Sequence, residues 1–440
     1  MSDVATETIE TEESPAFLQA VSDLAQTRTV VTSQPIFNTQ GIKLLEGGAR
    51  IDRGLYDRLV SHRLTRPLDE CVDAEPPLGT AVLRESALAA LERWPFFARM
   101  APTGTIRNVV LEALAGVPLP KPVALHLALA RDTRPSLFEH SILMALLSAY
   151  LAHQGTASSR ETRDAAAAGL LHDMGMLHIA PDLLDADERL SADRLKPVYV
   201  HPLTSSILIG RFADYPKTVV RAIVEHHERL DGSGYPRGLV GESISPLGRI
   251  VSLAEVVTAM FDGSRALPEK RVSLLLRIDP RRYDPALVAA VHRVLRDAPP
   301  PDAGLCGPAA RSIERLLRLA DELARWRETS QPLLGQLDGP HAALLRSINE
   351  QNATLQRMLH EAGVTPEQLG ALGDGLDDDG PVRVELWALA EELLWQLHAT
   401  ANQLKRRWHS AEPALHMPAA LATWLAGVEA LDAVAGVGTD

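Results

Sequence analysis

The spacing of apolar residues limits this chain to a largely helical fold. From Thr80 onward, Leu, Val and Ala recur at steps of three and four residues, as in TAVLRESALAALERW and IRNVVLEALAGV. Such spacing places apolar side chains on one face of a helix. Hydrophobic residues make up 46% of the chain but aromatic residues only 4%, a balance that favours helices over a β-rich fold. We therefore predict a mainly α protein built as a helical bundle.

Further helices are predicted wherever this pattern is bounded by Pro, Gly or a polar capping residue. These segments are SLFEHSILMALLSAYLAHQ, ETRDAAAAGLLHD, KTVVRAIVEHH, PLGRIVSLAEVVTAM, RSIERLLRLADELARW, HAALLRSINEQNATLQRMLHEAG and VELWALAEELLWQLHATANQLKRRWH. We expect the last two to form an antiparallel pair joined through GDGLDDDGP, residues 373–381. The Asp residues of that linker do not follow the EF-hand loop pattern, which favours a solvated connection.

Composition divides the chain into four predicted parts. Residues 1–27 are rich in Glu, Thr and Ser and are predicted to be a mobile acidic tail. Residues 28–79 combine short strands, Gly-containing turns and a helix over LYDRLVSHRL into a small α+β module, which ends in a linker at 73–79. A helical domain follows over 80–300, and DAPPPDAGLCGP separates it from a C-terminal helical region at 308–440.

Charge and cysteine content exclude several classes of protein. The formal net charge of −13 disfavours binding to duplex DNA or an anionic membrane, although a local metal site can still hold a small anion. The two cysteines, Cys71 and Cys306, imply neither a disulfide framework nor a cysteine metal motif. The acidic N-terminus does not resemble a secretory signal, and no apolar run is long enough for a membrane span. A cytoplasmic protein is expected.

Histidines and carboxylates that suit a metal centre are concentrated in one stretch. They are His140, His172, Asp173, His201, His226, His227 and Glu255. Imidazole and carboxylate are natural ligands for the divalent metals that activate water. Their separations of about 25 to 30 residues suit successive helices that each deliver one or two ligands to a common centre.

Helical geometry turns three of these side chains toward the core. His140 shares a face with Leu143 and Met144, and Glu255 shares one with Val251, while His226 likewise lies among apolar neighbours. An inward carboxylate needs a cation or a hydrogen-bond donor. Any one of these histidines alone would be read as a hydrogen-bonded core residue. The two adjacent pairs, with two further inward histidines, favour a metal site.

A glycine-rich loop, DGSGYPRG, follows the histidine pair at residues 231–238. Gly232 and Gly234 permit a tight turn, and Pro236 stiffens its exit. Such a loop would form a rigid lip over the metal site. Tyr235 could stack on a base there, although packing within the protein is the commoner role of such a residue.

These motifs resemble the HD-GYP family, a subgroup of the HD metal-dependent phosphohydrolases. The resemblance covers residues 134–295, with its signatures within 134–262. It rests on LLHDMGMLHIAPDLL, HPLTSSILIG and AIVEHHERLDGSGYPRGLVGESISPLGRIVSLAE. It implies an HD-type helical bundle that hydrolyses cyclic di-GMP or a related cyclic dinucleotide in bacterial signalling. It also implies two divalent metal ions, iron or manganese.

The resemblance assigns roles by position. The seven histidines and carboxylates match metal ligands, with Asp173 bridging two ions and acting with His172 in catalysis. Glu255 stands where the family has Asp, and it remains a competent oxygen ligand. Substrate would be held by Gly234, Tyr235, Pro236, Arg237 and Arg265.

Several positions depart from the family pattern. Met176 replaces a Lys, and a thioether cannot neutralise a phosphate. Ser136 replaces a Glu that some members use for a third metal. Only Arg265 and Lys270 remain of a basic stretch that follows the last ligand. His178 could offset the lost Lys, but a neutral surface histidine is the simpler interpretation.

Two alternatives to a cyclic-dinucleotide phosphodiesterase stay open. A degenerate HD-GYP domain could act as a nucleotide sensor or scaffold, with the C-terminal helices forming a homodimer or docking a signalling protein. Hydrolysis of another phosphorylated nucleotide is the second alternative. The N-terminal module carries no P-loop or dinucleotide-binding fingerprint, so the sequence does not assign it a ligand.

Overall fold

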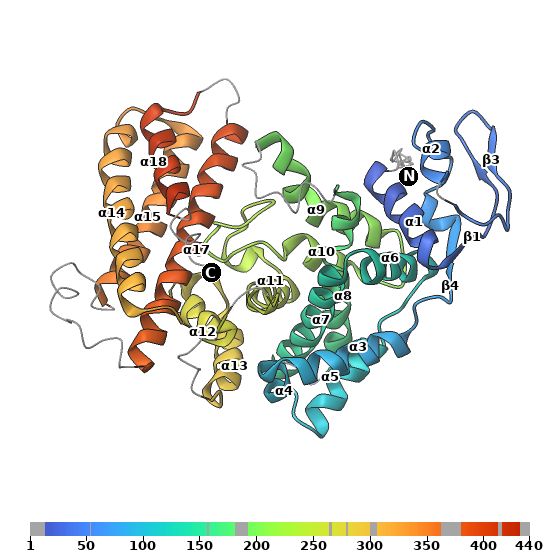
Figure 1. The fold of residues 1–440 in the computed structure, drawn as a ribbon, viewed down its shortest axis with the longest axis horizontal. Coiled ribbons are helices and arrows are strands. Elements are labelled where there is room, and N and C mark those ends of the chain that lie inside the picture. The colour runs from blue at the N-terminus through green and yellow to red at the C-terminus, as the bar shows by residue number, and fades with distance from the viewer. Residues whose placement is uncertain are drawn as a thin grey trace, which may run out of the picture. The chain divides into compact units, whose positions relative to one another are not determined.

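The fold is mainly α-helical, as predicted, with a few short strands near the N-terminus (Figure 1). This computed structural model describes residues 14–52, 54–155, 158–180, 192–263, 266–278, 280–299, 306–361, 380–411 and 416–431.

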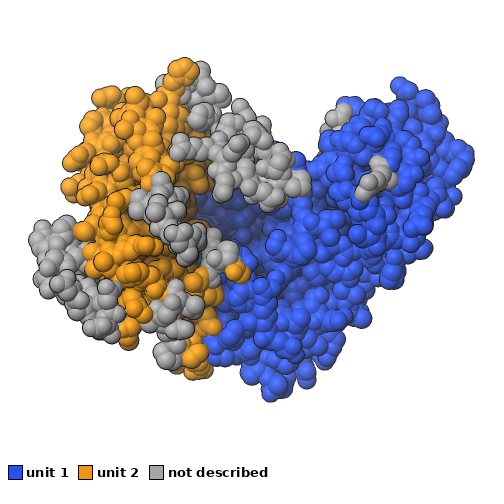
Figure 2. All heavy atoms as spheres, in the orientation of Figure 1, with its two compact units in different colours: residues 1–262 blue, residues 263–440 orange. Residues whose placement is uncertain are grey.

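The chain divides into two compact units, residues 1–262 and residues 263–440 (Figure 2). The predicted boundary near residue 300 is therefore wrong. Helices α12 (Pro268–Ile278) and α13 (Pro285–Arg296) belong to the second unit, where α12 packs against α17 (Gly380–Ala411).

The first described element corrects the prediction of a mobile tail over residues 1–27. Pro15–Thr27 forms helix α1, in which Phe17, Leu18 and Leu24 are buried. These apolar side chains recur at helical spacing, and their burial outweighs the polar composition from which the tail was inferred. Residues 1–13 lie outside the described residues.

The predicted small α+β module follows α1. Strand β1 (Thr29–Thr32) pairs antiparallel with β4 (Val72–Glu75), and β2 (Ile36–Phe37) pairs with β3 (Lys43–Leu45). Between them lie the short helix α2 (Leu55–Leu59) and the 3₁₀ helix η1 (Leu68–Glu70). Two expectations need correction here. Helix α2 is shorter than predicted, and the first part of the supposed linker at 73–79 belongs to β4.

A helical bundle makes up the rest of the first unit. Its elements are α3 (Thr80–Arg93), α4 (Pro95–Met100), α5 (Thr105–Ala115), α6 (Lys121–Thr133), α7 (Pro135–Gly155), α8 (Ser159–Leu171), η2 (Met174–His178), α9 (Ala192–Gly210), α10 (Lys217–Glu225), η4 (Gly241–Ser243), α11 (Pro246–Thr258) and η5 (Ala259–Phe261). Helix α7 is central, and α3, α5, α6, α8 and α11 pack around it. Among the described helices, α7 alone has the length and apolar composition of a membrane span. Because 72% of its apolar window is buried, it is equally consistent with a core helix.

The close contact between α7 and α8 aligns two of the predicted ligand-bearing segments. A Cβ at Gly169 would lie 2.6 Å from the carbonyl oxygen of Met144, so only glycine allows this approach. Ser158 caps α8 by accepting a hydrogen bond from the backbone N–H of Glu161 at 3.3 Å. The two helices thereby fix His140 on α7 near His172 at the end of α8.

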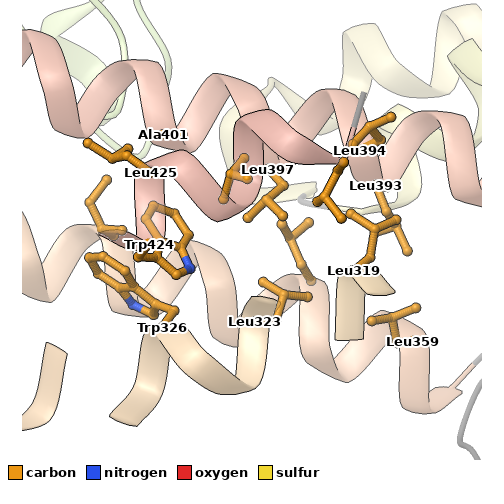
Figure 3. Packing of buried hydrophobic residues seen from close by; sticks show 14 of the residues in the cluster. Leu319, Leu323, Trp326, Leu359, Leu393, Leu394, Leu397, Ala401, Trp424 and Leu425 are labelled. Carbon is orange, nitrogen blue, oxygen red and sulfur yellow. The ribbon is translucent and has the colours of Figure 1, made fainter. Parts of the chain in front are cut away.

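The second unit has its own apolar core. Besides α12, α13 and α17, it contains η6 (Pro280–Arg282), α14 (Ala309–Leu334), α15 (Gly339–Glu361) and α18 (Ala419–Ala430). Leu323, Trp326, Leu397 and Trp424 are among the buried side chains that pack together there (Figure 3). His341 at the start of α15 donates a hydrogen bond to the carbonyl of Trp408, late in α17, at 3.1 Å. The predicted antiparallel pairing of these two helices is therefore confirmed.

Candidate metal centre

The seven predicted metal ligands come together in the first unit. His140 lies on α7, His172 and Asp173 follow α8, and His201 lies on α9. His226 and His227 follow α10, and Glu255 lies on α11. Their ligand atoms form three overlapping groups, in each of which all atoms lie within 4.8 Å of one another. The groups are His140, His172 and Glu255; His172, Asp173 and His226; and His201, His226 and His227.

Glu255 contacts two histidines on one side of this centre. Its Oε2 atom lies 3.1 Å from Nε2 of His140 and 3.4 Å from Nε2 of His172. Only 13% of the Glu255 side chain is exposed, and 21% of the His140 side chain. The predicted inward orientation of both residues is therefore confirmed. The longer side chain at this position still brings its carboxylate to the two imidazoles.

Asp173 lies between the histidine on this side of the centre, His172, and the histidines on the other side, His201 and His226. Its Oδ2 atom lies 3.3 Å from Nε2 of His172. Its Oδ1 atom lies 3.0 Å from Nε2 of His201 and 3.6 Å from Nε2 of His226. The Nε2 atoms of His201 and His226 are themselves 3.1 Å apart. One carboxylate thus faces histidines from three different segments, which is the arrangement that a bridging ligand requires.

Backbone carbonyls orient the three most buried histidines. The Nδ1 atom of His172 donates to the carbonyl of Gly169 at 2.7 Å, and Nδ1 of His226 donates to Ile223 at 2.6 Å. His201 makes the same kind of bond to Val198. A proton on Nδ1 leaves the Nε2 lone pair of a neutral imidazole available for a metal. Each of these Nε2 atoms points to the common centre.

Burial of these polar and ionised side chains is energetically unfavourable unless a cation is bound among them. His172 Nε2 and Asp173 Oδ1 are both buried and have no hydrogen-bond partner. Burial would raise the pKa of Asp173, but His172 and His201 outweigh it and hold that pKa well below its usual range. Burial, together with His172 and His201, lowers the pKa of His226 to about 3, which keeps this imidazole neutral. Burial would lower the pKa of His172, but Asp173 and Glu255 outweigh it and raise that pKa to about 10, so a positive charge here balances the two carboxylates. The ionised carboxylate of Asp173, the neutral imidazole of His226 and the unpartnered buried atoms fit a divalent transition metal, which would supply such a charge.

Glu228 is a supporting residue that the sequence interpretation missed. It is fully buried, and its carboxylate accepts hydrogen bonds from the backbone N–H groups of Arg237 at 2.7 Å and Leu239 at 2.9 Å. It thereby ties the loop at residues 231–240 to the end of α10. A Glu directly after the histidine pair and before a glycine-rich loop was the available signal, because loop N–H groups need acceptors.

The loop also packs on the centre through Tyr235. Its ring stacks on His227 with a centroid separation of 4.5 Å and an angle of 24° between the ring planes. A Cβ at Gly234 would lie 2.5 Å from the carbonyl oxygen of His227, so the close approach requires glycine. Pro236 follows in the same lip, and Arg237 is exposed. The packing role of Tyr235 is thus present in the structure, whereas base stacking stays a prediction.

Apart from Glu255, the described positions that depart from the family pattern belong to none of these ligand groups. The predicted surface position of His178 is wrong, and its ring is not free to offset the lost Lys. It stacks on Phe17 at 4.7 Å, and its Nε2 faces Nε2 of His126 at 3.5 Å. Ser136 is exposed. Lys270 pairs with Glu385 within the second unit, and Arg265 lies outside the described residues.

Comparison with known proteins matches the HD domain family over residues 125–287. A 3′3′-cGAMP-specific phosphodiesterase of Vibrio cholerae is 30% identical over 36% of this chain and 35% of its own length. The cyclic di-GMP phosphodiesterase response regulator RpfG of Xanthomonas campestris is 33% identical over 34% of this chain and 41% of its own. A cyclic di-GMP phosphodiesterase of Pseudomonas aeruginosa is 32% identical over 28% of this chain and 30% of its own.

This part of the chain is therefore an HD domain, and the predicted resemblance is confirmed. The chain spans only about a third of the length of the first of these relatives. Among solved structures, an HDG"Y"P protein from Bdellovibrio bacteriovorus has a TM-score of 0.35 and 17% sequence identity. That alignment covers 61% of this chain and 94% of the other.

Proposed function

We propose that this protein is a metal-dependent phosphodiesterase that hydrolyses a cyclic dinucleotide, with cyclic di-GMP as the first candidate. The observation that carries the proposal is the buried carboxylate of Asp173, which faces His172 on one side and His201 and His226 on the other. The names of the similar phosphodiesterases support the substrate class. A signalling role in the cytoplasm is part of the same proposal.

The seven ligands would hold two divalent ions, iron or manganese. Glu255, His140 and His172 would serve one ion, and His201, His226 and His227 the other, with Asp173 between them. When bound, such ions activate water as a nucleophile and neutralise charge on a phosphodiester. Of the chain's own residues, Asp173 would be the group that accepts a proton at its carboxylate. The loop at 231–240, held by Glu228, would position the nucleotide and exclude bulk water.

A degenerate domain that senses nucleotide or scaffolds a partner is the second candidate. The specific observation in its favour is Met176, whose thioether offers no cation to a phosphate. His178 does not replace that cation, because its ring packs on Phe17 and His126. Homodimerisation or docking through the C-terminal helices belongs to this candidate.

Metal analysis of the protein as purified, followed by incubation with cyclic di-GMP, tests the proposal. Assays with Mn(II), and with Fe(II) under anaerobic conditions, would resolve linear and mononucleotide products by chromatography. The test variant is Asp173→Asn, which keeps the size of the side chain but removes its charge. The matched control is Asp164→Asn, because Asp164 lies on α8 and pairs with Arg160 away from the centre.

We expect two metal ions per chain, turnover of the cyclic dinucleotide, and loss of both in Asp173→Asn but not in Asp164→Asn. Full metal occupancy without turnover of cyclic di-GMP or of any other nucleotide tested would favour the sensor. Turnover of a different phosphorylated nucleotide, with cyclic di-GMP left intact, would retain the catalytic centre but correct the substrate.

A further inference from the structure

The short 3₁₀ helix η2 (Met174–His178) directly follows two of the predicted ligands, His172 and Asp173. A 3₁₀ helix of five residues has few internal hydrogen bonds, and their geometry is poorer than in an α-helix. Its position therefore depends on contacts with other elements. Those contacts also decide where Asp173 lies relative to the ligands on α7 and α9.

Ser205 makes one of these contacts from α9. It is fully buried, and its Oγ atom accepts a hydrogen bond from the backbone N–H of Gly175 at 2.8 Å. This N–H lies in the first turn of η2, where backbone donors have no acceptor within the helix. A Cβ at Gly175 would lie 2.6 Å from the carbonyl oxygen of His201, so only glycine allows this close approach. Ser205 thus joins η2 to the turn of α9 that carries His201.

The hydrogen bond of Ser205 lies beside a contact within the metal centre. Oδ1 of Asp173 is 3.0 Å from Nε2 of His201. Gly175 follows Asp173 closely in sequence, and Ser205 lies about one helical turn after His201. The same two segments are therefore held together at two adjacent points. Alanine in place of Ser205 would leave the buried N–H of Gly175 without an acceptor, which favours separation of the segments.

Arg134 contacts η2 from the other side. Its backbone carbonyl accepts the hydrogen bond of Phe138 N–H at 3.2 Å, at the start of the helix that carries His140. Its guanidinium donates to the carbonyl of Met176 at 2.6 Å and to that of Ile179 at 2.5 Å. A planar guanidinium presents several donors in a fixed fork, so it can hold both carbonyls at once. Arg134 thus joins η2 to the start of α7.

We propose that Ser205 and Arg134 are positioning residues for the metal centre and that both act through η2. Ser205 sets Asp173 against His201, and Arg134 sets the same segment against His140. Neither positioning residue belongs to a group of candidate ligands. The assignment rests on the metal centre proposed above, but it concerns metal affinity and does not require turnover of a nucleotide.

The Mn(II) affinity of the metal-stripped full chain, measured by competition with a chelator, tests the role of Ser205. Ser205→Ala should lower this affinity about ten-fold, the scale found for residues that orient metal ligands. Ser206→Ala is the matched control, because Ser206 is also buried but its hydroxyl donates to the carbonyl of Leu203 within α9 at 2.8 Å. It should bind Mn(II) like the wild type.

Thermal unfolding of the metal-free variants distinguishes positioning from a loss of stability. A role in stability alone would lower the unfolding temperature of Ser205→Ala but leave the Mn(II) affinity of the folded protein unchanged. Affinities are therefore compared at a temperature at which every variant is folded. Equal Mn(II) affinity in Ser205→Ala and the wild type would overturn the role of Ser205, as would an equal loss in Ser206→Ala.

Arg134 provides a second test at a position that is only partly buried. Arg134→Met removes both hydrogen bonds to η2 and should weaken Mn(II) binding about ten-fold. Arg134→Lys should weaken it less, because an ammonium group can still donate to one carbonyl. Arg131→Met is the control, since the guanidinium of Arg131 bonds to the adjacent Asp132. Wild-type affinity in Arg134→Met would overturn the role of Arg134.

The wild-type protein separates failure of this assignment from failure of the proposed function. Mn(II) binding without hydrolysis of cyclic di-GMP would contradict the proposed function and leave the comparison of variants decisive. Hydrolysis with unchanged affinity in Ser205→Ala and Arg134→Met would overturn only the positioning roles. Absence of Mn(II) binding in the wild type would overturn the metal centre and the positioning roles together.

Discussion

Glu255 is the predicted ligand at which this chain departs from the HD-GYP pattern that its motifs resemble. Its carboxylate reaches both His140 and His172 although the position resembles one held by Asp in the HD-GYP family. A carboxylate oxygen is retained at this position, and only the length of the side chain differs.

Two substitutions of Glu255 distinguish the effect of its negative charge on metal affinity from the effect of its side-chain length. Glu255→Gln removes the negative charge and should reduce metal affinity at least ten-fold, because His140 and His172 lose their carboxylate partner. Glu255→Asp keeps the charge and should retain more metal than Glu255→Gln. Competition with a chromophoric chelator measures the affinities. Equal metal affinity in Glu255→Gln and the wild type would show that Glu255 is not a ligand.

His178 predicts a pH dependence of stability that is independent of the metal ligands. Burial, with further contributions from His126, Arg211 and Arg134, lowers its pKa to about 3 in the folded protein. In the unfolded chain a histidine has a pKa near 6.5. As pH falls below about 6.5, the unfolded state therefore takes up a proton that the folded state does not, and stability declines.

Replacement of this histidine tests the argument. His178→Phe keeps a ring against Phe17 but cannot take up a proton. Relative to the wild type, its free energy of unfolding should rise as pH is lowered from 7 toward 4, by at most about 1.4 kcal/mol per pH unit. Urea unfolding of both proteins across this range gives the difference. Parallel curves would contradict the assigned pKa.

At the scale of elements, helices α7, α9 and α11 and the ends of α8 and α10 carry the predicted ligands, and buried carboxylates fix the segments around them. Glu225 is fully buried at the end of α10 and accepts a hydrogen bond from the backbone N–H of Ser245 at 2.9 Å, which fixes the start of α11. A Cβ at Gly248 would lie 2.9 Å from Cβ of Glu225, so a larger residue there would have to displace the Glu225 side chain. This contact brings the segment of His226 and the helix of Glu255 together.

Substitution of Glu228 should change the loop at 231–240 without changing metal binding. Glu228→Gln places an amide N–H₂ group against a backbone donor of Arg237 or Leu239, which loosens the loop. We expect unchanged metal content, faster amide exchange over the loop and a fall of about 10- to 100-fold in kcat/KM. Glu242→Gln, at an exposed position in the same segment, is the control. Loss of metal in Glu228→Gln would instead assign this residue to the centre itself.

At the scale of the whole molecule, the chain consists of two compact units with the metal centre in the first. Metal binding stabilises only the unit that holds the ligands. Calorimetry should therefore show more than one transition, and only one of them should shift upward with Mn(II). In Asp173→Asn that shift should disappear while the other transition stays in place. A single transition that moves as a whole would indicate that the two units unfold cooperatively.

The sequence by itself determined the class of fold and predicted the set of candidate ligands. Helical periodicity is a local property, so most helices of the bundle could be located from spacing alone, as with α3 and α5. The seven ligands could be named because histidine pairs and inward carboxylates are rare without a partner. The motif resemblance added the expectation that Asp173 bridges two metal ions. In the structure its two carboxylate oxygens lie near different histidines, His172 and His201, which agrees with that expectation.

Only the tertiary structure decided which contacts between distant segments are made. Composition predicted a mobile tail where Phe17 packs on His178, because burial against a distant segment cannot be read from local polarity. The acceptor roles of Glu228 and Ser205 likewise depend on the backbone and side chains that surround them in space. The division at residue 262 follows from which helices share a core. Local sequence patterns therefore predict the helices and the types of functional side chain, whereas packing between distant segments decides which residues contact one another.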